Sequence, residues 1–227
     1  DCNFINLDFL YYCASLKNIK VENKDNYKFI QGDICDKDLI SNILKDNNID
    51  CIMHFAAQSH VQNSFDNVDL YVKDNILGTK NLLECSRNYG KLKLFLHVST
   101  DEVYGESYSE DNEDNIKTEK SLLDPTTPYS SSKAAAELLA MSYYHSFKLP
   151  IMIVRSNNVY GFNQYPEKVI PRFIMLLSKD MKLTIQGKGD NLRTFVHSYD
   201  SANAFDLISR KGEIGEIYNI GSSISVS

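Results

Sequence analysis

The sequence predicts an α/β protein built on a doubly wound parallel sheet, followed by a smaller mixed α/β lobe. Short apolar segments alternate with longer amphipathic segments, which is typical of parallel strands with helices on both faces. Polar or small residues follow several apolar segments directly, as they do where such a sheet binds a ligand. The 227 residues, 43% of them hydrophobic, allow one sizeable core and are too few for two full domains.

The strands of the main sheet are predicted from short runs rich in β-branched and aromatic residues. In chain order these runs are residues 3–7, 27–31, 51–55, 94–98 and 151–155. Helices are predicted where apolar residues recur every three or four positions, at residues 38–45, 66–88, 130–147 and 169–178. Asp36 can cap the first helix, and Pro150 separates the third from the strand that follows it.

Beyond residue 155 the alternation becomes less regular. Shorter strands are predicted at residues 183–186, 194–197 and 217–220, with a helix between the last two. We therefore expect a Rossmann-like domain at residues 1–156, without its first strand and glycine-rich loop, and part of a substrate-binding lobe at residues 157–227. The chain is expected to be truncated at both ends, because it opens within a strand-like pattern and stops after one.

Composition argues against several classes of function. The net charge of −6 argues against a nucleic acid or an acidic membrane surface as the main partner, because phosphate groups attract basic surfaces. No apolar run approaches the roughly 20 residues that span a bilayer. Five cysteines without CxxC spacing suggest a reduced, cytoplasmic protein. No histidine has a partner at metal-ligand spacing, so no metal site is predicted.

Three strand ends suggest a dinucleotide site. Asp8 follows the first strand, where an acidic side chain can bind the adenosine ribose and favours NAD over NADP. Gly32-Asp33-Ile34 follows the second strand, and Phe55-Ala56-Ala57, with small residues that permit close backbone approach, ends the third. Taken singly, an Asp after a strand is more often a plain capping residue. Because the carboxyl ends of parallel strands meet in one crevice, the three endings together favour bound NAD.

Tyr129 and Lys133 have the YxxxK spacing, which places both side chains on one face of a helix. An ammonium group there can lower the pKa of the phenol, which can then exchange a proton with a sugar hydroxyl. The spacing alone is common by chance, and a surface pair is then the better interpretation. Its position at the start of a helix, beyond a nucleotide-like crevice, favours the catalytic interpretation.

A second cluster, Ser99-Thr100-Asp101-Glu102, lies where the strand at residues 94–98 ends. Adjacent carboxylates at such a place can also belong to a solvated loop. Elimination of water needs an acid for the leaving hydroxyl and a base for the neighbouring carbon. Since two close carboxylates raise one pKa, we expect Asp101 to stay protonated while Glu102 is ionised.

Together these motifs resemble the NDP-glucose 4,6-dehydratases, a family of extended short-chain dehydrogenases/reductases. The run STDEVYG combined with YxxxK is the most specific part. Two segments, AAQSHVQNSF and NNVYG, are most similar to the plant-type UDP-glucose 4,6-dehydratase of UDP-rhamnose synthesis. The resemblance spans nearly the whole chain, through residues 6–8, 32–34, 55–61, 99–105, 129–133, 157–161, 166–168 and 218–221.

The resemblance implies a reaction on UDP-glucose or dTDP-glucose with NAD as cofactor. Tyr129 would take the C4 hydroxyl proton while hydride passes to NAD, with Thr100 hydrogen-bonded to the same oxygen. Glu102 would then remove the C5 proton, Asp101 would protonate the departing C6 hydroxyl, and the hydride would return to C6. By position, further residues would line the cofactor or sugar site (Ser59, Asn75), lie near nicotinamide (Asn158) or hold the sugar nucleotide (Asn157, Lys168, Arg193, Asn219). Caps, turns and surface charge are the alternatives for these positions.

Other functions fit part of the same pattern. A 4-epimerase or a UDP-glucuronate decarboxylase would need Tyr129 and Lys133 but not the pair Asp101 and Glu102. A non-catalytic nucleotide-sugar-binding protein would need none of these proton-transfer groups. The resemblance also implies a homodimer, in which the helices at residues 66–88 and 130–147 of both subunits form a four-helix bundle.

Overall fold

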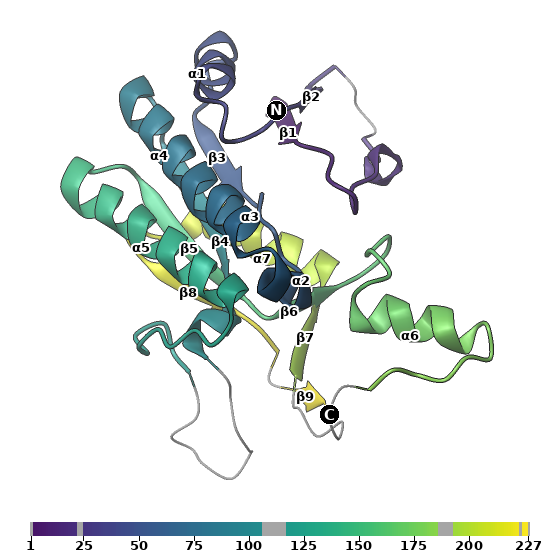
Figure 1. Cartoon of the computed structure of the whole chain (residues 1–227). Coiled ribbons are helices and arrows are strands. Elements are labelled where there is room, and N and C mark those ends of the chain that lie inside the picture. The colour runs from purple at the N-terminus through teal and green to yellow at the C-terminus, as the bar shows by residue number, and fades with distance from the viewer. Residues whose placement is uncertain (1, 22–24, 106–116, 186–192, 223, 227) are drawn as a thin grey trace.

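A computed structural model describes residues 2–21, 25–105, 117–185, 193–222 and 224–226. Its centre is a four-stranded parallel sheet in the order β3-β4-β5-β8 (Figure 1). These strands are β3 (Cys51–His54), β4 (Leu94–Thr100), β5 (Ile151–Ser156) and β8 (Ile217–Ile220). One face is covered by α4 (Gly78–Tyr89) and α5 (Pro128–Phe147), and the other by α7 (Ser198–Lys211). The predicted α/β class, with helices on both faces, is confirmed.

The two central strands divide the apolar core between these faces. All of β5 is buried, and in β4 only Val98 is partly exposed. Phe95 and Ile153 pack toward α4 and α5, whereas Leu96 and Met152 pack toward α7. This alternation follows from the two-residue period of a strand. Parallel strands covered on both faces are apolar almost without interruption, as these two segments are.

Local side-chain contacts fix where two helices begin. α1 (Lys37–Asp46) starts after Asp36, whose carboxylate accepts a hydrogen bond from the backbone N–H of Leu39 at 3.0 Å, as predicted. α5 starts with a reciprocal capping box between Thr127 and Ser130, and Pro128 occupies its first turn. These contacts hold the first turn of α5, which carries a predicted catalytic residue.

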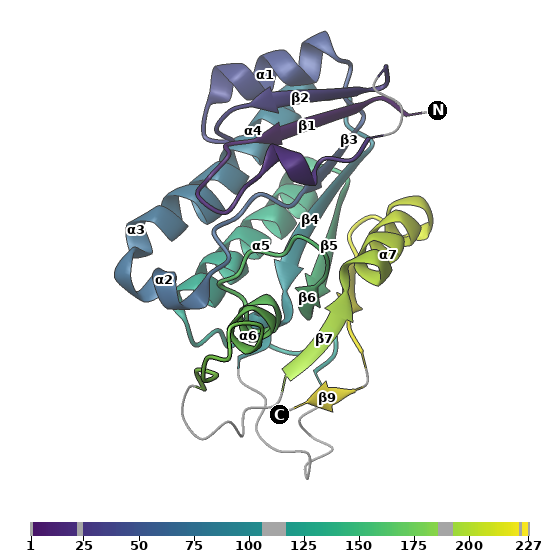
Figure 2. The ribbon, with the colours of Figure 1, turned by 90° about the vertical axis from the view of Figure 1, so that its right-hand side faces the viewer.

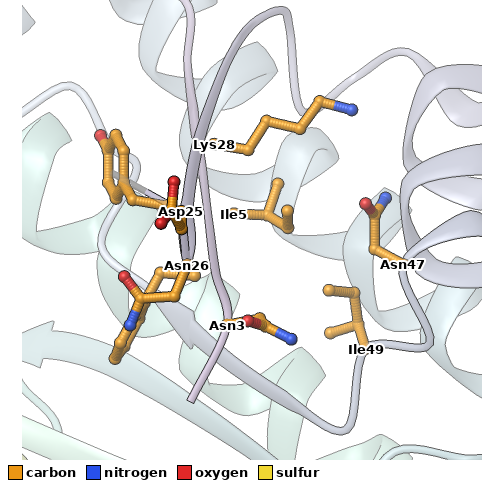
Figure 3. A pocket seen from close by; sticks show the side chains of 9 residues that line it. Asn3, Ile5, Asp25, Asn26, Lys28, Asn47 and Ile49 are labelled. Carbon is orange, nitrogen blue, oxygen red and sulfur yellow. The ribbon is translucent and has the colours of Figure 1, made fainter. Parts of the chain in front are cut away.

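A separate parallel pair consists of β1 (Phe4–Asp8) and β2 (Tyr27–Gln31), joined through the short helix η1 (Leu16–Asn18). Among the described residues, neither strand is hydrogen-bonded to the four-stranded sheet. A cavity of about 320 Å³ opens where the pair begins, between Ile5 and Lys28 on one side and Asn47 and Ile49 on the other (Figure 3). This cavity lies at the opposite end of the strands from the residues predicted to bind a dinucleotide.

The single helix predicted at residues 66–88 corresponds to three elements that follow one another without a gap: α3 (Val68–Tyr71), a π-helical segment η2 (Val72–Leu77) and α4. A separate short helix that was not predicted, α2 (Val61–Asp66), precedes them. α2 begins early because the ring of His60 accepts a hydrogen bond from the backbone N–H of Asn63 at 3.2 Å. Asn67, with φ −135° and ψ 49°, leaves the helical conformation and separates α2 from α3.

The C-terminal part forms a second, small sheet. β6 (Asn158–Tyr160) pairs in parallel with β7 (Arg193–His197), which pairs antiparallel with β9 (Ser225–Val226). Figure 2 shows β7, β9 and the helix α6 (Val169–Leu177) on the side toward which β4 points. Residues 183–185 are not a strand, contrary to the prediction, and Gln186 lies outside the described residues.

The last strand of the main sheet comes from this C-terminal part of the sequence. β8 pairs with β5, with Asn219 opposite Arg155. Residues beyond 157 therefore contribute both to the small sheet and to the edge of the main sheet. Within the described part of the chain, no helix is long and apolar enough to cross a membrane.

Candidate active site

The end of β4 and the first turn of α5 bring two predicted catalytic hydroxyls together. The Thr100 side chain lies close enough to the hydroxyl of Tyr129 to lower its pKa, and both residues are buried. The ring of Tyr71 meets that of Tyr129 edge-on, with 6.3 Å between the ring centroids. Tyr71 in turn donates a hydrogen bond to the backbone oxygen of His60. Tyr129 is therefore held from two sides at the carboxyl end of the sheet.

Lys133 lies on the same buried face of α5 as Tyr129, as the YxxxK spacing predicts. Its Nζ donates a hydrogen bond to the backbone oxygen of Val98 at 2.7 Å. Burial lowers the pKa of Lys133 to about 8, against the opposing effect of the Glu137 charge. The lysine can therefore change its protonation state near neutral pH, which an exposed lysine does not do.

The phenol of Tyr129 is less acidic than the sequence led us to expect. Its pKa is raised, first by burial and then by the charges of Glu102 and Asp101, while the hydrogen bond with Thr100 acts in the lowering direction. The expected lowering of this pKa by Lys133 is wrong for the arrangement in this structure. The physical reason is that desolvation and two nearby carboxylates outweigh an amine that is directed to a backbone carbonyl.

The two adjacent carboxylates belong to the 3-10 turn η3 (Asp101–Tyr104), which Thr100 caps by accepting a hydrogen bond from the backbone N–H of Glu102. Burial raises the pKa of both acids. Hydrogen bonds from Asn157 and Thr100 oppose this effect at Asp101, whereas the charge of Asp101 raises the pKa of Glu102 further. Both carboxyl groups are therefore easier to protonate than exposed ones. The predicted order, with Asp101 protonated and Glu102 ionised, stays a prediction.

Two predicted substrate-binding cations lie within electrostatic reach of these acids. The charges of Arg193 and Lys168 both lower the pKa of Glu102. Lys168 donates a hydrogen bond from Nζ to the backbone oxygen of Ser59 at 2.8 Å, which ties the segment before α6 to the loop after β3. Arg193 is exposed at the start of β7. Positive charge at this rim suits an anionic ligand such as a diphosphate.

Three predicted asparagine ligands lie at or near the same edge. Asn157 donates a hydrogen bond from Nδ2 to Oδ2 of Asp101 at 2.5 Å. The amide oxygen of Asn219 accepts a hydrogen bond from the hydroxyl of Tyr104 at 2.8 Å. Asn158 lies in β6, next to Asn157 in the chain. Two of these amides are thus joined to the η3 turn that carries the acids.

Asn75, predicted to line the cofactor or sugar site, has another position. It lies in η2 with 1% of its surface exposed. Its Oδ1 accepts a hydrogen bond from the backbone N–H of Gln58 at 2.7 Å, and its Nδ2 donates to the backbone oxygen of Gln58 and to the hydroxyl of Ser132. These bonds leave the amide no ligand-facing role. Asn75 instead fastens the loop after β3 to α5.

Two of the predicted dinucleotide contacts are open to a ligand. Asp8 is exposed at the end of β1, and its Oδ1 accepts a hydrogen bond from the backbone N–H of Leu10 at 2.6 Å. Ala56 is exposed and Ala57 half-buried after β3, so a ligand can come close to the backbone there. An acceptor carboxylate and small neighbouring side chains fit the ribose and diphosphate parts of a dinucleotide.

Three further predicted contacts are engaged within the protein. Asp33 is paired with Lys73, whose Nζ lies 3.0 Å from Oδ2. The side chain of Ile34 packs against the core between α1 and α4. The ring of Phe55 meets Phe205 of α7 edge-on, at a centroid distance of 5.1 Å. Phe55 nevertheless stays 53% exposed, so this contact does not close its side chain to a ligand.

A buried cluster behind the η3 turn was not predicted. Arg155 donates from Nη1 to the hydroxyl of Tyr104 at 2.7 Å and from Nε to both carboxylate oxygens of Glu137 at 3.1 Å. Two signals in the sequence point to this cluster. Arg155 ends an otherwise apolar strand, and Glu137 follows Lys133 by four positions, on the buried side of its helix.

Comparison with known proteins decides the family. A family model described as GDP-mannose 4,6 dehydratase matches residues 2–227. The chain belongs to this family of nucleotide-sugar 4,6-dehydratases. This dehydratase-family chain is 51% identical over 228 residues to the dTDP-D-glucose 4,6-dehydratase of Dictyostelium discoideum. The match covers 97% of the chain and 52% of that relative.

Two other matched proteins are also named 4,6-dehydratases. The dehydratase-family chain is 48% identical over 225 residues to a trifunctional UDP-glucose 4,6-dehydratase/3,5-epimerase/reductase of Arabidopsis thaliana, covering 98% of the chain and 33% of that relative. The crystal structure of DesIV, a dTDP-glucose 4,6-dehydratase of Streptomyces venezuelae with NAD bound, has a TM-score of 0.93 at 37% identity and covers 99% of this chain and 67% of DesIV. The predicted family and Rossmann-like fold class are thus confirmed. The chain spans about half the length of the Dictyostelium relative and a third of the Arabidopsis relative.

Proposed function

We propose that the protein is an NAD-dependent NDP-glucose 4,6-dehydratase, which forms NDP-4-keto-6-deoxyglucose and water. The observation that carries this proposal is that Thr100 and Tyr129 lie together on the same edge of the sheet as the half-buried acids Asp101 and Glu102. Oxidation at C4 needs the phenol, and elimination across C5 and C6 needs an acid and a base. A 4-epimerase or a decarboxylase does not need the acid and the base for elimination. The two acids therefore favour the dehydratase.

NAD would bind across the carboxyl ends of β1, β2 and β3. Asp8 would accept hydrogen bonds from the adenosine ribose, Asp33 and Ile34 would lie at the adenine, and the backbone at Ala56 and Ala57 would approach the diphosphate. When bound, the nicotinamide accepts a hydride and later gives it back, so the reaction needs no external oxidant. The exposed carboxylate of Asp8 and the small side chains beside it support this placement.

The first role of the protein is to remove a proton from the C4 hydroxyl. Tyr129 would accept that proton, with Thr100 hydrogen-bonded to the same oxygen. Because the raised pKa of Tyr129 favours the neutral phenol, Tyr129 must pass its own proton on as it accepts the proton of the sugar. Lys133, whose pKa burial lowers to about 8, is the group on this helix face that can give up or take a proton near neutral pH.

The second role is the elimination. Glu102 would remove the C5 proton, which the neighbouring ketone makes acidic, and Asp101 would protonate the departing C6 oxygen. Burial raises the pKa of Asp101 and so favours the protonated form that a general acid needs, although hydrogen bonds from Asn157 and Thr100 oppose this effect. Lys168 supports the required order, because its charge lowers the pKa of Glu102 and favours the ionised base.

The sugar nucleotide would lie between the main sheet and the lobe formed by residues 157–227. Arg193 and Lys168 would bind its diphosphate, with Asn157 and Asn219 as amide partners and Ser59 at the sugar. The acidic pair sits beside the two cations, which supports a ligand with an anionic diphosphate and a neutral hexose. We favour UDP-glucose over dTDP-glucose because of the plant-like segments around Gln58 and Asn157.

A homodimer and a cytosolic location complete the proposal. α4 and α5 lie side by side, joined by a hydrogen bond from the hydroxyl of Tyr143 to Glu84 at 2.9 Å (Figure 1). Leu77, directly before α4, and Leu138, on α5, are 53% and 63% exposed apolar side chains that a partner subunit would cover. The described cysteines are all free, which supports a reducing compartment. Light scattering of the full-length protein tests the dimer.

The experiment is an NMR assay of the full-length protein in D₂O with UDP-glucose and, separately, dTDP-glucose. The expected product has a new C6 methyl signal and deuterium at C5. Glu102→Gln should abolish the deuterium incorporation, and Tyr129→Phe should lower kcat by about 100-fold or more. Formation of UDP-galactose alone would identify an epimerase. Binding of the sugar nucleotide with no turnover would identify a non-catalytic protein.

A further inference from the structure

Behind the catalytic turn lies a buried ion pair that takes no direct part in the proposed chemistry. Arg155 is 3% exposed and Glu137 is 1% exposed. Nε of Arg155 donates to both carboxylate oxygens of Glu137 at 3.1 Å, and Nη2 donates to the same carboxylate. Burying two charges costs several kcal/mol per ion, so a buried pair is poor evidence of stabilisation in itself. Its value has to be sought in what else it contacts.

The remaining terminal nitrogen of Arg155 points away from Glu137 and toward the η3 turn. Nη1 donates to the hydroxyl of Tyr104 at 2.7 Å and to the backbone oxygen of Glu119 at 3.1 Å. The guanidinium also lies over the ring of Tyr104, 4.7 Å from its centroid. Arg155 thus holds the last residue of the turn that begins with Asp101.

The guanidinium fixes the direction of the hydrogen bonds that follow. Because Arg has only donors, the hydroxyl of Tyr104 must accept from Arg155 and has its own proton free to donate. That proton goes to Oδ1 of Asn219 at 2.8 Å. The backbone N–H of Asn219 is held by the carboxylate of Glu119 at 2.9 Å. The amide of Asn219 is therefore oriented with its oxygen inward, which leaves its Nδ2 donor side for a ligand.

We propose that Arg155, anchored by Glu137, is a positioning residue that acts through Tyr104 to present Asn219 as a hydrogen-bond donor to an acceptor oxygen of the bound sugar nucleotide. This inference rests on the proposed function. In the proposed reaction Arg155 does not contact the reacting atoms. It acts by fixing the direction of the hydrogen bond from Tyr104 to Asn219 and by holding η3 in position.

The test is calorimetry and steady-state kinetics on the full-length, NAD-loaded protein with UDP-glucose. Tyr104→Phe keeps the ring under the guanidinium but removes the donor to Asn219. We expect Kd and KM to rise about tenfold with kcat changed less than threefold, which corresponds to the loss of one oriented hydrogen bond. In an Asn219→Ala background, Tyr104→Phe should have no further effect on Kd. Additive effects of the two changes would overturn the proposal.

A second variant separates positioning from simple stabilisation. Arg155→Met with Glu137→Leu removes both buried charges together, so that neither is left unpaired. If the ion pair were purely structural, the apolar pair could replace it and the double variant would bind substrate with the Kd of the parent protein. That result would overturn the proposal. We expect the double variant to fold, with Kd still raised about as much as in Tyr104→Phe. Should it fail to fold, the cycle of Tyr104→Phe and Asn219→Ala decides. A parent protein that binds neither UDP-glucose nor dTDP-glucose would instead refute the proposed function.

Discussion

The Asn157 amide donates from Nδ2 to Oδ2 of Asp101, and the two atoms lie 2.5 Å apart. The register of β4 and β5 causes this contact, since Thr100 pairs with Ser156 and the next residues of both strands then meet. Gly221 packs against the other side of the amide, where a Cβ would lie 2.0 Å from Oδ1 of Asn157. The Nδ2 group of Asn157 is therefore held in its hydrogen bond with Asp101, the proposed general acid.

Asn157→Ala should raise the pKa of Asp101, because the charged form loses a donor while burial remains. If protonated Asp101 is the acid, activity should persist to higher pH. The alkaline limb of kcat should move up by about one unit, the scale of one hydrogen bond to a charged group. The pH profile of turnover measures this, and Asp101→Asn should remove the same limb. A limb that stays in place in Asn157→Ala contradicts the assignment.

Lys133 makes stability depend on pH in a definite direction. Its pKa is about 8 in the folded protein against 10.5 for a free lysine, so the unfolded chain binds more protons between these values. Stability contributed by this group therefore rises with pH from about 8 to 10.5, and below pH 8 the cost of burying the charge is fully present. The unfolding free energy of the parent minus that of Lys133→Met should increase by up to about 3 kcal/mol between pH 7 and 10.5.

Urea unfolding at pH 7, 9 and 10.5 measures that difference. Lys80→Met, at an exposed position of α4, is the matched control, and its difference from the parent should stay flat over the same range. A flat difference for Lys133→Met as well would mean that burial does not lower the pKa of this amine, which would then stay charged in the folded protein up to the pH at which a free lysine titrates.

Gly105 ends the turn that carries the acids, and a side chain there meets backbone. Its φ is +82°, and a Cβ would lie 2.4 Å from the oxygen of Asp124. Gly105→Ala should lower the unfolding free energy by about 2–4 kcal/mol and also lower kcat, because η3 must shift. Gly90 at the end of α4 also has positive φ, but its nearest atom is 3.9 Å away. Gly90→Ala should cost about 1 kcal/mol and leave kcat unchanged. Equal effects at both positions would refute the clash.

The sequence predicts strand boundaries well both at the edge and in the centre of the main sheet. The strand at residues 217–220 has the observed boundaries, and the segment at residues 151–155 is one residue short of β5. The helix predicted at residues 66–88 starts two residues later, at Val68, because Asn67 leaves the helical conformation, and neither this break nor the π-helical form of η2 is visible in the apolar pattern. β6 was not predicted because its three residues are too few to show the alternation of apolar and polar side chains that indicates a strand.

The site could be located from the sequence, but its electrostatics could not. Thr100 and Tyr129 stand in motifs whose residues come together once the strand and helix are placed. The pKa of Asp101 instead depends on Asn157, which lies 56 residues beyond Asp101 and contacts it only through the pairing of β4 with β5. Burial, which raises both pKa values, is equally a property of the assembled fold.

One contact joins the two sides of the proposed crevice. The hydroxyl of Tyr12, in the loop after β1, donates to Oε2 of Glu167 at 2.6 Å, across 155 positions in the sequence. The ring of Tyr12 also meets Tyr165 edge-on, at a centroid distance of 5.6 Å. Glu167 precedes Lys168, which is bound to the loop after β3. The contact thus ties the proposed adenosine end of the site to the segment that carries a proposed diphosphate ligand.

Tyr12→Phe should loosen both segments without unfolding the protein. Tyr12 is 51% exposed, so losing its hydrogen bond should cost at most about 1 kcal/mol of global stability. Local opening is governed by such contacts, and amide exchange should therefore speed up in residues 9–18 and 161–168 while β4 and β5 keep their protection. Hydrogen–deuterium exchange with mass spectrometry measures this, with Tyr11→Phe, at the neighbouring tyrosine, as the matched control. If exchange rose only in residues 9–18, the two segments would open independently and the Tyr12–Glu167 bond would not couple them.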